Sequence, residues 1–234
     1  MATCLTGVVI QASDAKSLSE FWSEVLGEGA TTAAQGQRVA LEFVPADGPK
    51  PAGAKNRVHL DLQGGPEQLE RLLALGAVHA DIGQGDVPWV VLADPEGNEF
   101  CLQPRPEPGI RWSAICQDAA NSQAQSAFWT AATGWRQVDE GSWGVALEAS
   151  ERHEASEPQD EPEQVDVPAP AEASLRLVMG PPAAPKDGPA RIYLRLGPQP
   201  RIDAAVEASR LVHEGAKRSG ELLVDPEGNE FCVA

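Results

Sequence analysis

The sequence DPEGNEFC occupies residues 94–101 and occurs again, unchanged, at residues 225–232 of a chain of 234 residues. An identity of eight residues does not arise by chance in a chain of this length, so it indicates an internal duplication. Asp, Pro, Gly and Asn favour turns, and in each copy the phrase follows one hydrophobic run and leads into another. We therefore expect the phrase to contain the turn of a β-hairpin that the chain builds twice.

A second pair of similar sequences gives the length of the duplicated unit. The sequence SLSEFWSEVLG at 17–27 is matched by AQSAFWTAATG at 124–134, an offset of 107 residues, whereas the two DPEGNEFC copies are offset by 131. The second copy has therefore gained a net 24 residues between these landmarks. A domain of slightly more than 100 residues is an ordinary size, so we expect two domains rather than one.

An acidic insert accounts for the gain. Residues 151–172 contain eight acidic residues and four prolines, a composition that cannot bury enough apolar surface to offset the entropy of ordering. We expect this insert to be disordered. The expected domains are residues 1–104 and residues 111–234, joined by a proline-rich linker at 105–110.

Both copies show the same order of expected elements. In the first copy, a helix capped by Ser13 or Asp14 runs to about Leu26 and ends at Gly27. A second amphipathic helix is expected from Pro66 to Gly76. Alternating or continuous hydrophobic runs predict strands, which lie at 6–12, 39–45, 57–63, 88–93 and 99–103. The chain is therefore expected to be an α+β protein of four βαβββ modules, and the first module lacks one strand because 28–38 is weakly patterned.

Composition excludes several classes of partner. The formal net charge is −17, and such a surface repels nucleic acid and anionic lipid. No apolar run reaches the ~18 residues typical of a membrane span, and no basic leader precedes the short apolar stretch near Met1. The four cysteines form no CxxC pair, as expected of a reduced cytoplasmic protein. Monomer and homodimer both remain open.

These motifs resemble the glyoxalase-like branch of the vicinal oxygen chelate superfamily. The resemblance rests on HLDL at 59–62, a helix ending in LG, a hydrophobic strand with DPEGNEF, and an FW-x-x-x-LG helix after the first strand. It covers nearly all the chain outside the insert, and it implies two tandem domains, each of two βαβββ modules with sheets curled around a pocket. Relatives include glyoxalase I, extradiol dioxygenases, fosfomycin-inactivating enzymes, and metal-free bleomycin- and mitomycin-binding proteins.

The resemblance also identifies three metal-ligand positions in each domain, and this chain departs from the pattern at most of them. Metal-using relatives typically place a His on the first strand, a His or Gln at the HLDL position and a Glu on the last strand. The corresponding residues here are Gly7, His59 and Cys101 in the first domain and Ala114, Tyr193 and Cys232 in the second. His59 alone matches, so we expect no metal cofactor, and a divalent metal is the alternative. A shifted register could also bring in Glu99.

Strand alternation predicts which side chains face the pockets. In RVHLDLQ and EFCLQ the apolar residues belong to the core, which leaves the other face for ligands. The candidate ligand-binding residues are His59, Asp61, Gln63, Cys101 and Gln103 in the first pocket and Arg191, Tyr193 and Arg195 in the second. Trp89 is added as a candidate aromatic wall.

Each candidate also has a simpler interpretation. His59 could be a strand residue hydrogen-bonded only to Asp61 or Glu99, and the two arginines could pair with local acids. A thiol at Cys101 activated by His59 is a further possibility.

The expected function is metal-free binding of a small organic molecule, as in drug- or metabolite-sequestering relatives. Two alternatives remain, a metal-dependent lyase or dioxygenase that uses His59, and an interaction module that docks a partner through the acidic insert.

Overall fold

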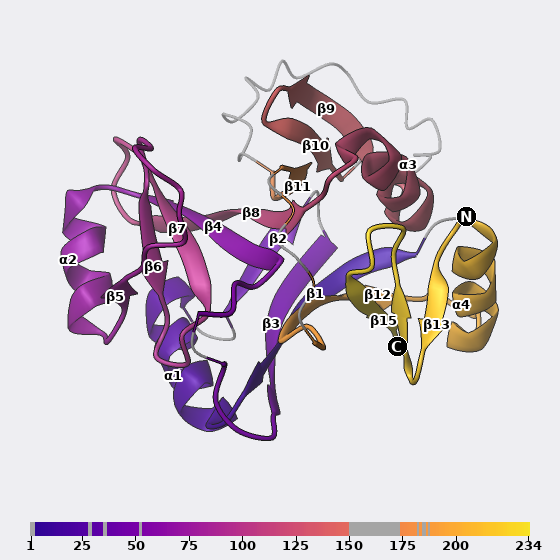
Figure 1. Ribbon diagram of the computed structural model, residues 1–234, viewed down its shortest axis with the longest axis horizontal. Coiled ribbons are helices and arrows are strands. Elements are labelled where there is room, and N and C mark those ends of the chain that lie inside the picture. Colours follow the sequence, from indigo (N-terminus) through magenta and orange to yellow (C-terminus); the bar gives the residue numbers. More distant parts are fainter. Residues whose placement is uncertain are drawn as a thin grey trace, which may run out of the picture.

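The computed structural model describes residues 3–27, 30–34, 37–51, 53–149, 174–181, 183, 186 and 188–234, and it is an α+β structure with four described helices and two mixed sheets (Figure 1). The acidic insert lies outside the described residues, so its expected disorder stays a prediction. Among the described helices, none has the length and apolarity needed to cross a membrane.

Four modules follow one another along the chain. The first contains β1 (Cys4–Ala12), α1 (Ala15–Leu26), β2 (Thr31–Ala34) and β3 (Gln37–Pro45). The second contains β4 (Val58–Gly64), α2 (Pro66–Ala74), β5 (Val78–His79), β6 (Val90–Ala93) and β7 (Glu99–Pro104). The third contains β8 (Ile110–Asp118), α3 (Ser122–Thr133), β9 (Arg136–Gly141), β10 (Gly144–Glu148) and β11 (Arg176–Gly180). The fourth contains β12 (Ile192–Gly197), α4 (Ala204–His213), β13 (Lys217–Ser219), β14 (Leu222–Val224) and β15 (Glu230–Val233).

The expected elements are present, with one correction. Asp14 caps α1 by accepting a hydrogen bond from the Ser17 backbone N–H at 3.0 Å, and Gly27 follows the last helical residue, as predicted. The first module does not lack a strand, however, because β2 pairs with β3 in an antiparallel hairpin. The segment TTAA has little hydrophobic pattern of its own, so pairing with the longer β3 defines it as a strand.

The sheets combine modules that are not neighbours in the expected domains. The seven-stranded sheet has the order β13-β14-β15-β12-β1-β3-β2, so it joins the first and fourth modules. The eight-stranded sheet has the order β5-β6-β7-β4-β8-β11-β10-β9 and joins the second and third. Each sheet is therefore built from one module of each sequence repeat.

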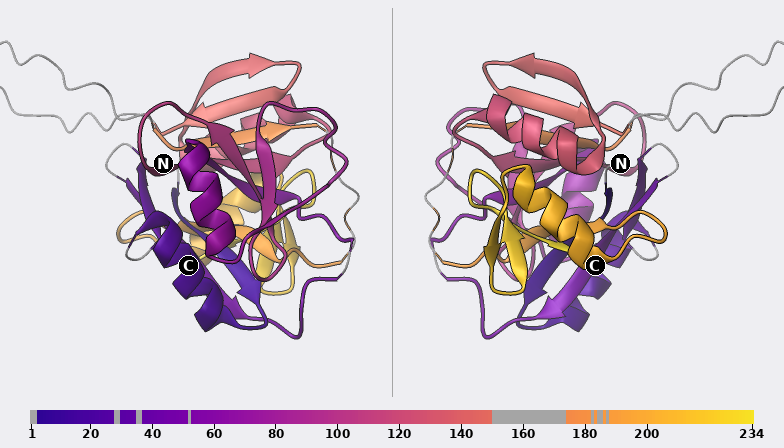
Figure 2. Two further views of the ribbon diagram at one scale, coloured as in Figure 1. Left: turned by 90° about the vertical axis from the view of Figure 1, so that its left-hand side faces the viewer. Right: turned by 90° about the vertical axis from the view of Figure 1, so that its right-hand side faces the viewer.

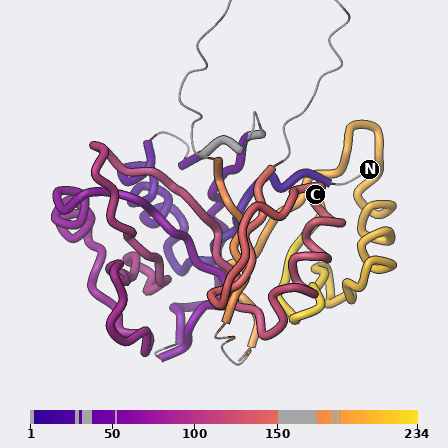
Figure 3. Tube along the Cα trace, turned by 90° about the horizontal axis from the view of Figure 1, so that it is seen from above, coloured from indigo at the N-terminus to yellow at the C-terminus, as the bar shows by residue number. Residues whose placement is uncertain are grey.

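Two antiparallel strand pairs join modules of different repeats within one sheet. β1 pairs with β12, with Val9 opposite Tyr193, and β4 pairs with β8, with His59 opposite Cys116. In Figure 3 the indigo strand β1 reaches into the side of the molecule that holds α4. The helices α2 and α4 lie at opposite ends of the long axis, as the two side views in Figure 2 show.

The helices α1 and α3 hold the two sheets together. α1 contacts β1 and β3 of one sheet and β8 of the other, while α3 contacts β9, β10 and β11 as well as β1. Trp22 of α1 meets Phe100 of β7 edge to face at 5.2 Å, and Trp129 of α3 meets Phe231 of β15 at 5.3 Å. Buried residues of all four modules therefore form one continuous core.

The repeated phrase forms the same turn twice, as predicted. Asp94 Oδ1 accepts hydrogen bonds from the backbone N–H groups of Glu96 at 3.0 Å and Asn98 at 2.9 Å, and Asp94 Oδ2 accepts one from Trp22 Nε1 at 3.2 Å. Gly97 has φ of +81°, a left-handed conformation that favours glycine. The turn of the second module is thereby fixed to the helix of the first.

The second copy repeats these contacts on the other side. Asp225 Oδ1 accepts from the N–H groups of Glu227 at 3.0 Å and Asn229 at 2.9 Å, and Asp225 Oδ2 accepts from Trp129 Nε1 at 3.3 Å. Each turn thus belongs to one sheet and binds a helix that packs mainly on the other sheet. The phrase is needed twice because it ties together modules that the sheets separate.

Candidate functional site

The candidate site lies on the face of the eight-stranded sheet that points away from the core. On β4, Val58, Leu60 and Leu62 are buried in the core, as the alternation predicted. His59 and Asp61 consequently point to the opposite face, which we call the concave face. Their neighbours across β4 are Cys101 on β7, opposite Asp61, and Cys116 on β8, opposite His59.

His59 and Asp61 form the polar centre of this face. His59 Nε2 lies 3.5 Å from Asp61 Oδ1, and the His59 side chain is 19% exposed. Asp61 Oδ2 accepts a hydrogen bond from Gln103 Nε2 at 2.5 Å. Asp61 Oδ1 is buried and has no hydrogen-bond partner among the described residues. An unsatisfied buried acceptor costs roughly 1–3 kcal/mol, so a donor from a ligand at this oxygen would stabilise the site.

Two thiols beside Asp61 are held in their neutral form. Burial is the largest cause that raises the pKa of Cys101 well above its ordinary value, and the negative charge of Asp61 adds to it. The same two causes, in the same order, raise the pKa of the buried Cys116. A nucleophilic cysteine needs the thiolate, so these surroundings oppose the interpretation of Cys101 as a nucleophile activated by His59.

Sequence reasoning missed Cys116. The position carried over from relatives was Ala114, which has no donor atom, whereas Cys116 lies two residues later on the same face of β8 and opposite His59. Period-two alternation along β8 could have found it. The pairing of β8 with β4, which joins the second and third modules, could not be inferred from the order of the strands.

Three donor atoms converge here in a way that fits a metal ion. One ligand atom each from His59, Asp61 and Cys116 lies within 4.8 Å of the others. Nitrogen, carboxylate and thiolate donors are the set that Zn²⁺ prefers, and three protein ligands leave a fourth position open. The free Asp61 Oδ1 also fits a metal ligand, and Gln103 would orient that carboxylate from behind. Glu99 does not contribute, because Lys50 and the Asn56 backbone N–H bind its carboxylate.

The remaining candidates, Gln63 and Trp89, lie on β4 and directly before β6. Gln63 accepts a hydrogen bond from Arg111 across β4 and β8. Trp89 is 37% exposed and lies immediately before β6. Val91 of β6 and Val178 of β11 lie opposite Cys101 and Cys116 respectively, so apolar side chains border the polar centre.

The residues predicted for the second pocket do not act as one group. Arg195 forms an ion pair with Glu42 of β3, so both lie on the seven-stranded sheet. Arg191 instead donates to the backbone carbonyls of Gly48 at 3.0 Å and Gln11 at 2.9 Å and forms an ion pair with Glu96 at 3.4 Å, so each arginine has an acidic partner. Burial is the main cause that raises the pKa of Tyr193, which keeps its hydroxyl neutral.

Comparison with known proteins identifies the family. A model of the glyoxalase-like domain matches residues 7–103 and 114–234, nearly the whole chain. The chain belongs to the glyoxalase-like domain family. Its fold and its two matched segments are those of a two-domain member of the vicinal oxygen chelate superfamily.

Two solved structures share this fold over nearly the whole chain. Glyoxalase I from Zea mays is 12% identical with a TM-score of 0.54, over 99% of this chain and 92% of that chain. A putative dioxygenase from Bacillus subtilis subsp. subtilis str. 168 is 12% identical with a TM-score of 0.58, over 100% of this chain and 85% of that one. A glyoxalase/bleomycin resistance protein from Albidiferax ferrireducens T118 is 19% identical with a TM-score of 0.29 and covers 43% of this chain. A search of curated proteins gives no match.

Proposed function

We propose that this glyoxalase-like protein binds a small organic molecule, without a metal, on the concave face of the eight-stranded sheet. The observation that carries the proposal is the buried Asp61 Oδ1, which has no hydrogen-bond donor among the described residues and lies 3.5 Å from Nε2 of the partly exposed His59. A ligand hydroxyl or N–H group can supply that donor. The function would be sequestration of a drug or metabolite.

The surroundings of Asp61 favour a neutral ligand with an apolar body. Gln103 holds the second carboxylate oxygen, so the free oxygen keeps a fixed direction. His59 can donate or accept through its ring nitrogens, which allows a second hydrogen bond to the same ligand. Val91 and Val178 provide apolar contacts beside the two thiols. A few fixed polar groups among apolar side chains are typical of small-molecule sites.

A second candidate is a metal-dependent lyase or dioxygenase, which the convergence of His59, Asp61 and Cys116 favours. These three residues would hold the ion, and the ion would supply Lewis-acid polarisation of a substrate oxygen. Asp61 would then act as a ligand rather than as the acceptor of a hydrogen bond. Binding of an ion would also deprotonate the Cys116 thiol, whose pKa is otherwise raised.

One experiment separates the two candidates. Protein purified without chelator is analysed for Ni, Zn, Fe and Mn, and the same preparation is screened against small organic ligands by thermal shift. The metal-free proposal expects well under one equivalent of metal, and it expects His59→Ala to weaken ligand binding by about tenfold, the equivalent of one hydrogen bond.

The matched control is His79→Ala, which removes an exposed histidine on β5 and should leave ligand affinity unchanged. Stoichiometric metal that is lost in His59→Ala but kept in His79→Ala would replace the metal-free proposal with the metal-dependent one.

A further inference from the structure

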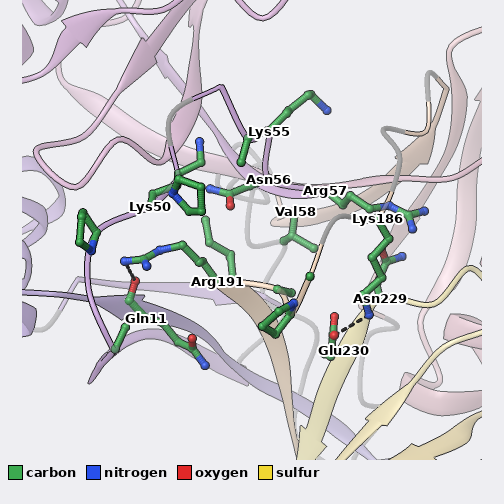
Figure 4. Close-up of a pocket in the computed structure, with 18 of the residues that line it drawn as sticks. Gln11, Lys50, Lys55, Asn56, Arg57, Val58, Lys186, Arg191, Asn229 and Glu230 are labelled. Atoms are coloured by element: carbon green, nitrogen blue, oxygen red, sulfur yellow. Dashed lines mark hydrogen bonds and ion pairs between the residues drawn. The ribbon is translucent and has the colours of Figure 1, made fainter.

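A cavity of about 420 Å³ lies where the connections between modules meet, away from the concave face. It is lined by residues between 46 and 58 of the β3–β4 connection, by Lys186 and residues 188–192 before and within β12, and by Gln11, Asn229 and Glu230. Its lining includes Val58 and Ile192, which belong to the core, and not His59 or Tyr193. Figure 4 shows Asn229 and Glu230 on one side and Gln11 and Arg191 on the other.

The two halves of the molecule present matching residues to this cavity. Lys50 donates to the carbonyl of Gly97 at 2.8 Å and binds Glu99, and Lys186 donates to the carbonyl of Gly228 at 2.7 Å and binds Glu230. The two lysines therefore close the two DPEGNE turns in the same way.

The register of the sheets extends the match. Leu60 lies opposite Phe100, and Leu194 lies opposite Phe231. Counting back along β4 and β12 from these leucines makes Arg57 equivalent to Arg191. Each arginine contacts the glutamate of the other repeat's turn, Arg57 at Glu227 and Arg191 at Glu96.

The match fails at one position. In the first half, Asn56 donates from Nδ2 to Asn98 Oδ1 at 3.1 Å and from its backbone N–H to Glu99 Oε2 at 3.3 Å. The residue equivalent to Asn56 in the second half is Ala190, which has no side-chain donor and whose backbone N–H does not bond to Glu230 Oε2. Asn229 Oδ1 and Glu230 Oε2 are buried and have no hydrogen-bond partner among the described residues.

The orientation of these acceptors is fixed. Asn229 Nδ2 donates to Asp225 Oδ2 at 3.1 Å, so the amide oxygen, not the nitrogen, is left over. Glu230 Oε1 is occupied by Lys186. The two residues are only 2% and 6% exposed, and both line the cavity. A buried acceptor pair without donors is costly, and its counterpart in the same chain shows which chemistry satisfies it.

We propose that this cavity is a second ligand site, and that it takes a small neutral carboxamide or urea that replaces Asn56 at the open acceptors. The N–H groups of the ligand donate to Asn229 Oδ1 and Glu230 Oε2. The apolar body of the ligand packs on Val58, Ile192 and the prolines of the two connections.

Charge around the cavity explains why the ligand is neutral. Every lysine and arginine of the lining has an acidic partner, and the pairs are Lys50–Glu99, Lys55–Asp118, Arg57–Glu227, Lys186–Glu230 and Arg191–Glu96. An anion would have to break one of these pairs. The Lys186 side chain is 33% exposed whereas that of Lys50 is 7% exposed, so the open acceptors lie on the more accessible side.

Benzamide and phenylurea are suitable probes, and acetophenone is the matched control because it keeps the ring and carbonyl but has no N–H group. Binding to the full chain is measured by calorimetry and by saturation-transfer NMR. We expect one benzamide or phenylurea per chain and at least about tenfold weaker binding of acetophenone, since each lost hydrogen bond to a charged or buried acceptor has an effect of that order. Equal binding of benzamide and acetophenone contradicts the proposal.

Two substitutions at position 190 locate the site. Ala190→Asn restores the donor of the first half, so it should raise the melting temperature and abolish probe binding. Ala190→Leu has a similar size but no donor, so it should block the probe without raising the melting temperature. Asn56→Ala, on the opposite half, should lower the melting temperature and keep the affinity for the probe.

Three outcomes overturn the proposal. The first is that neither probe binds, as expected if the acceptors hold ordered water only. The second is that Ala190→Asn leaves probe affinity unchanged. The third is that Ala190→Asn and Ala190→Leu change the melting temperature equally, because the acceptors would then not need a donor.

Discussion

At the scale of single residues, Asp61 controls the chemistry of the concave face. Its carboxylate lies beside two thiols and contributes, after burial, to the raised pKa of both Cys101 and Cys116. Its Oδ2 atom is held by Gln103, and its Oδ1 atom is left for His59, a ligand or a metal. The Asp61 carboxylate thus offers a ligand a hydrogen-bond acceptor and, through its negative charge, lowers the reactivity of both thiols.

The raised thiol pKa values predict the order of cysteine labelling. In the folded protein at pH 7.5, Cys101 and Cys116 should react with maleimide far more slowly than the partly exposed Cys4, because they are buried and protonated. Peptide mapping by mass spectrometry after timed labelling measures this. Asp61→Asn should speed labelling of both thiols at pH 9, since removing the negative charge lowers their pKa. Rapid labelling of Cys101 in the wild type would restore the nucleophile interpretation.

At the scale of elements, the turn of DPEGNEFC acts as a connector between sheets. Beyond the contacts of Asp94, Glu96 accepts hydrogen bonds from the backbone N–H groups of Ser13 and Asp14 at 3.0 and 2.9 Å, directly before α1. Glu227 does the same for Ala120 and Asn121 before α3, at 3.1 and 3.0 Å. The phrase is identical in both copies because nearly every polar residue in it binds a partner at the equivalent position in the surroundings of each copy.

Removing the aspartate of either turn should have the same large effect. Asp94→Ala removes the acceptor of the backbone N–H groups of Glu96 and Asn98 and of the side chains of Asn98 and Trp22. It should lower the free energy of unfolding by about 3 kcal/mol. Asp225→Ala should cost at least as much, because Gln125 also donates to it. Urea denaturation measures both changes.

The control for these variants is Glu20→Gln, which removes an exposed ion pair with Lys16 and should change the free energy of unfolding by less than about 0.5 kcal/mol. A loss below 1 kcal/mol in both aspartate variants would mean that the turns do not hold the helices.

The acidic insert should be removable without loss of the fold. β10 and β11 pair antiparallel, and Glu148 lies opposite Arg176 in that ladder, so the two ends that flank the insert are already close. Replacing residues 151–172 with a short glycine-rich turn should shift the melting temperature by only a few degrees, since loop closure contributes on the order of 1 kcal/mol. Differential scanning calorimetry tests this, and a large loss of stability would mean that the insert packs on the fold.

At the scale of the whole molecule, each sheet crosses the boundary between the sequence repeats. β1 depends on β12 for one of its ladders, and β4 depends on β8. α1 and α3 then fix the two sheets to each other through one core. The two repeats are therefore units of sequence, and the sheets are the units of hydrogen bonding.

This topology predicts the behaviour of fragments. Residues 1–104 and 111–234, produced separately, should not fold as stable monomers, because β1 and β4 would each lose a ladder and expose an edge. Mixed in equal amounts, they should form a 1:1 complex with the circular dichroism spectrum of the whole chain. A cooperative monomeric unfolding transition of fragment 1–104, measured by sedimentation and denaturation, would show that the exchange between repeats is not required.

The sequence alone determined the local features of this protein. The turn chemistry of Asp94 and Gly97, the cap at Asp14 and the alternation that turns His59 and Asp61 away from the core all depend on residues close together in the chain. Such features follow from local backbone preferences and from the two faces of a strand, so they can be read before the fold is known.

Only the tertiary structure decided which strands lie side by side. Antiparallel pairing of β4 with β8 or with another strand satisfies the same backbone groups, so strand order carries no signal of the choice. That choice brought Cys116 to His59 and paired Arg191 with Glu96. It also left Asn229 Oδ1 without a donor among the described residues, whereas Asn98 Oδ1 receives one from Asn56. The site depends on contacts between distant segments, which packing of the whole core selects and no local pattern encodes.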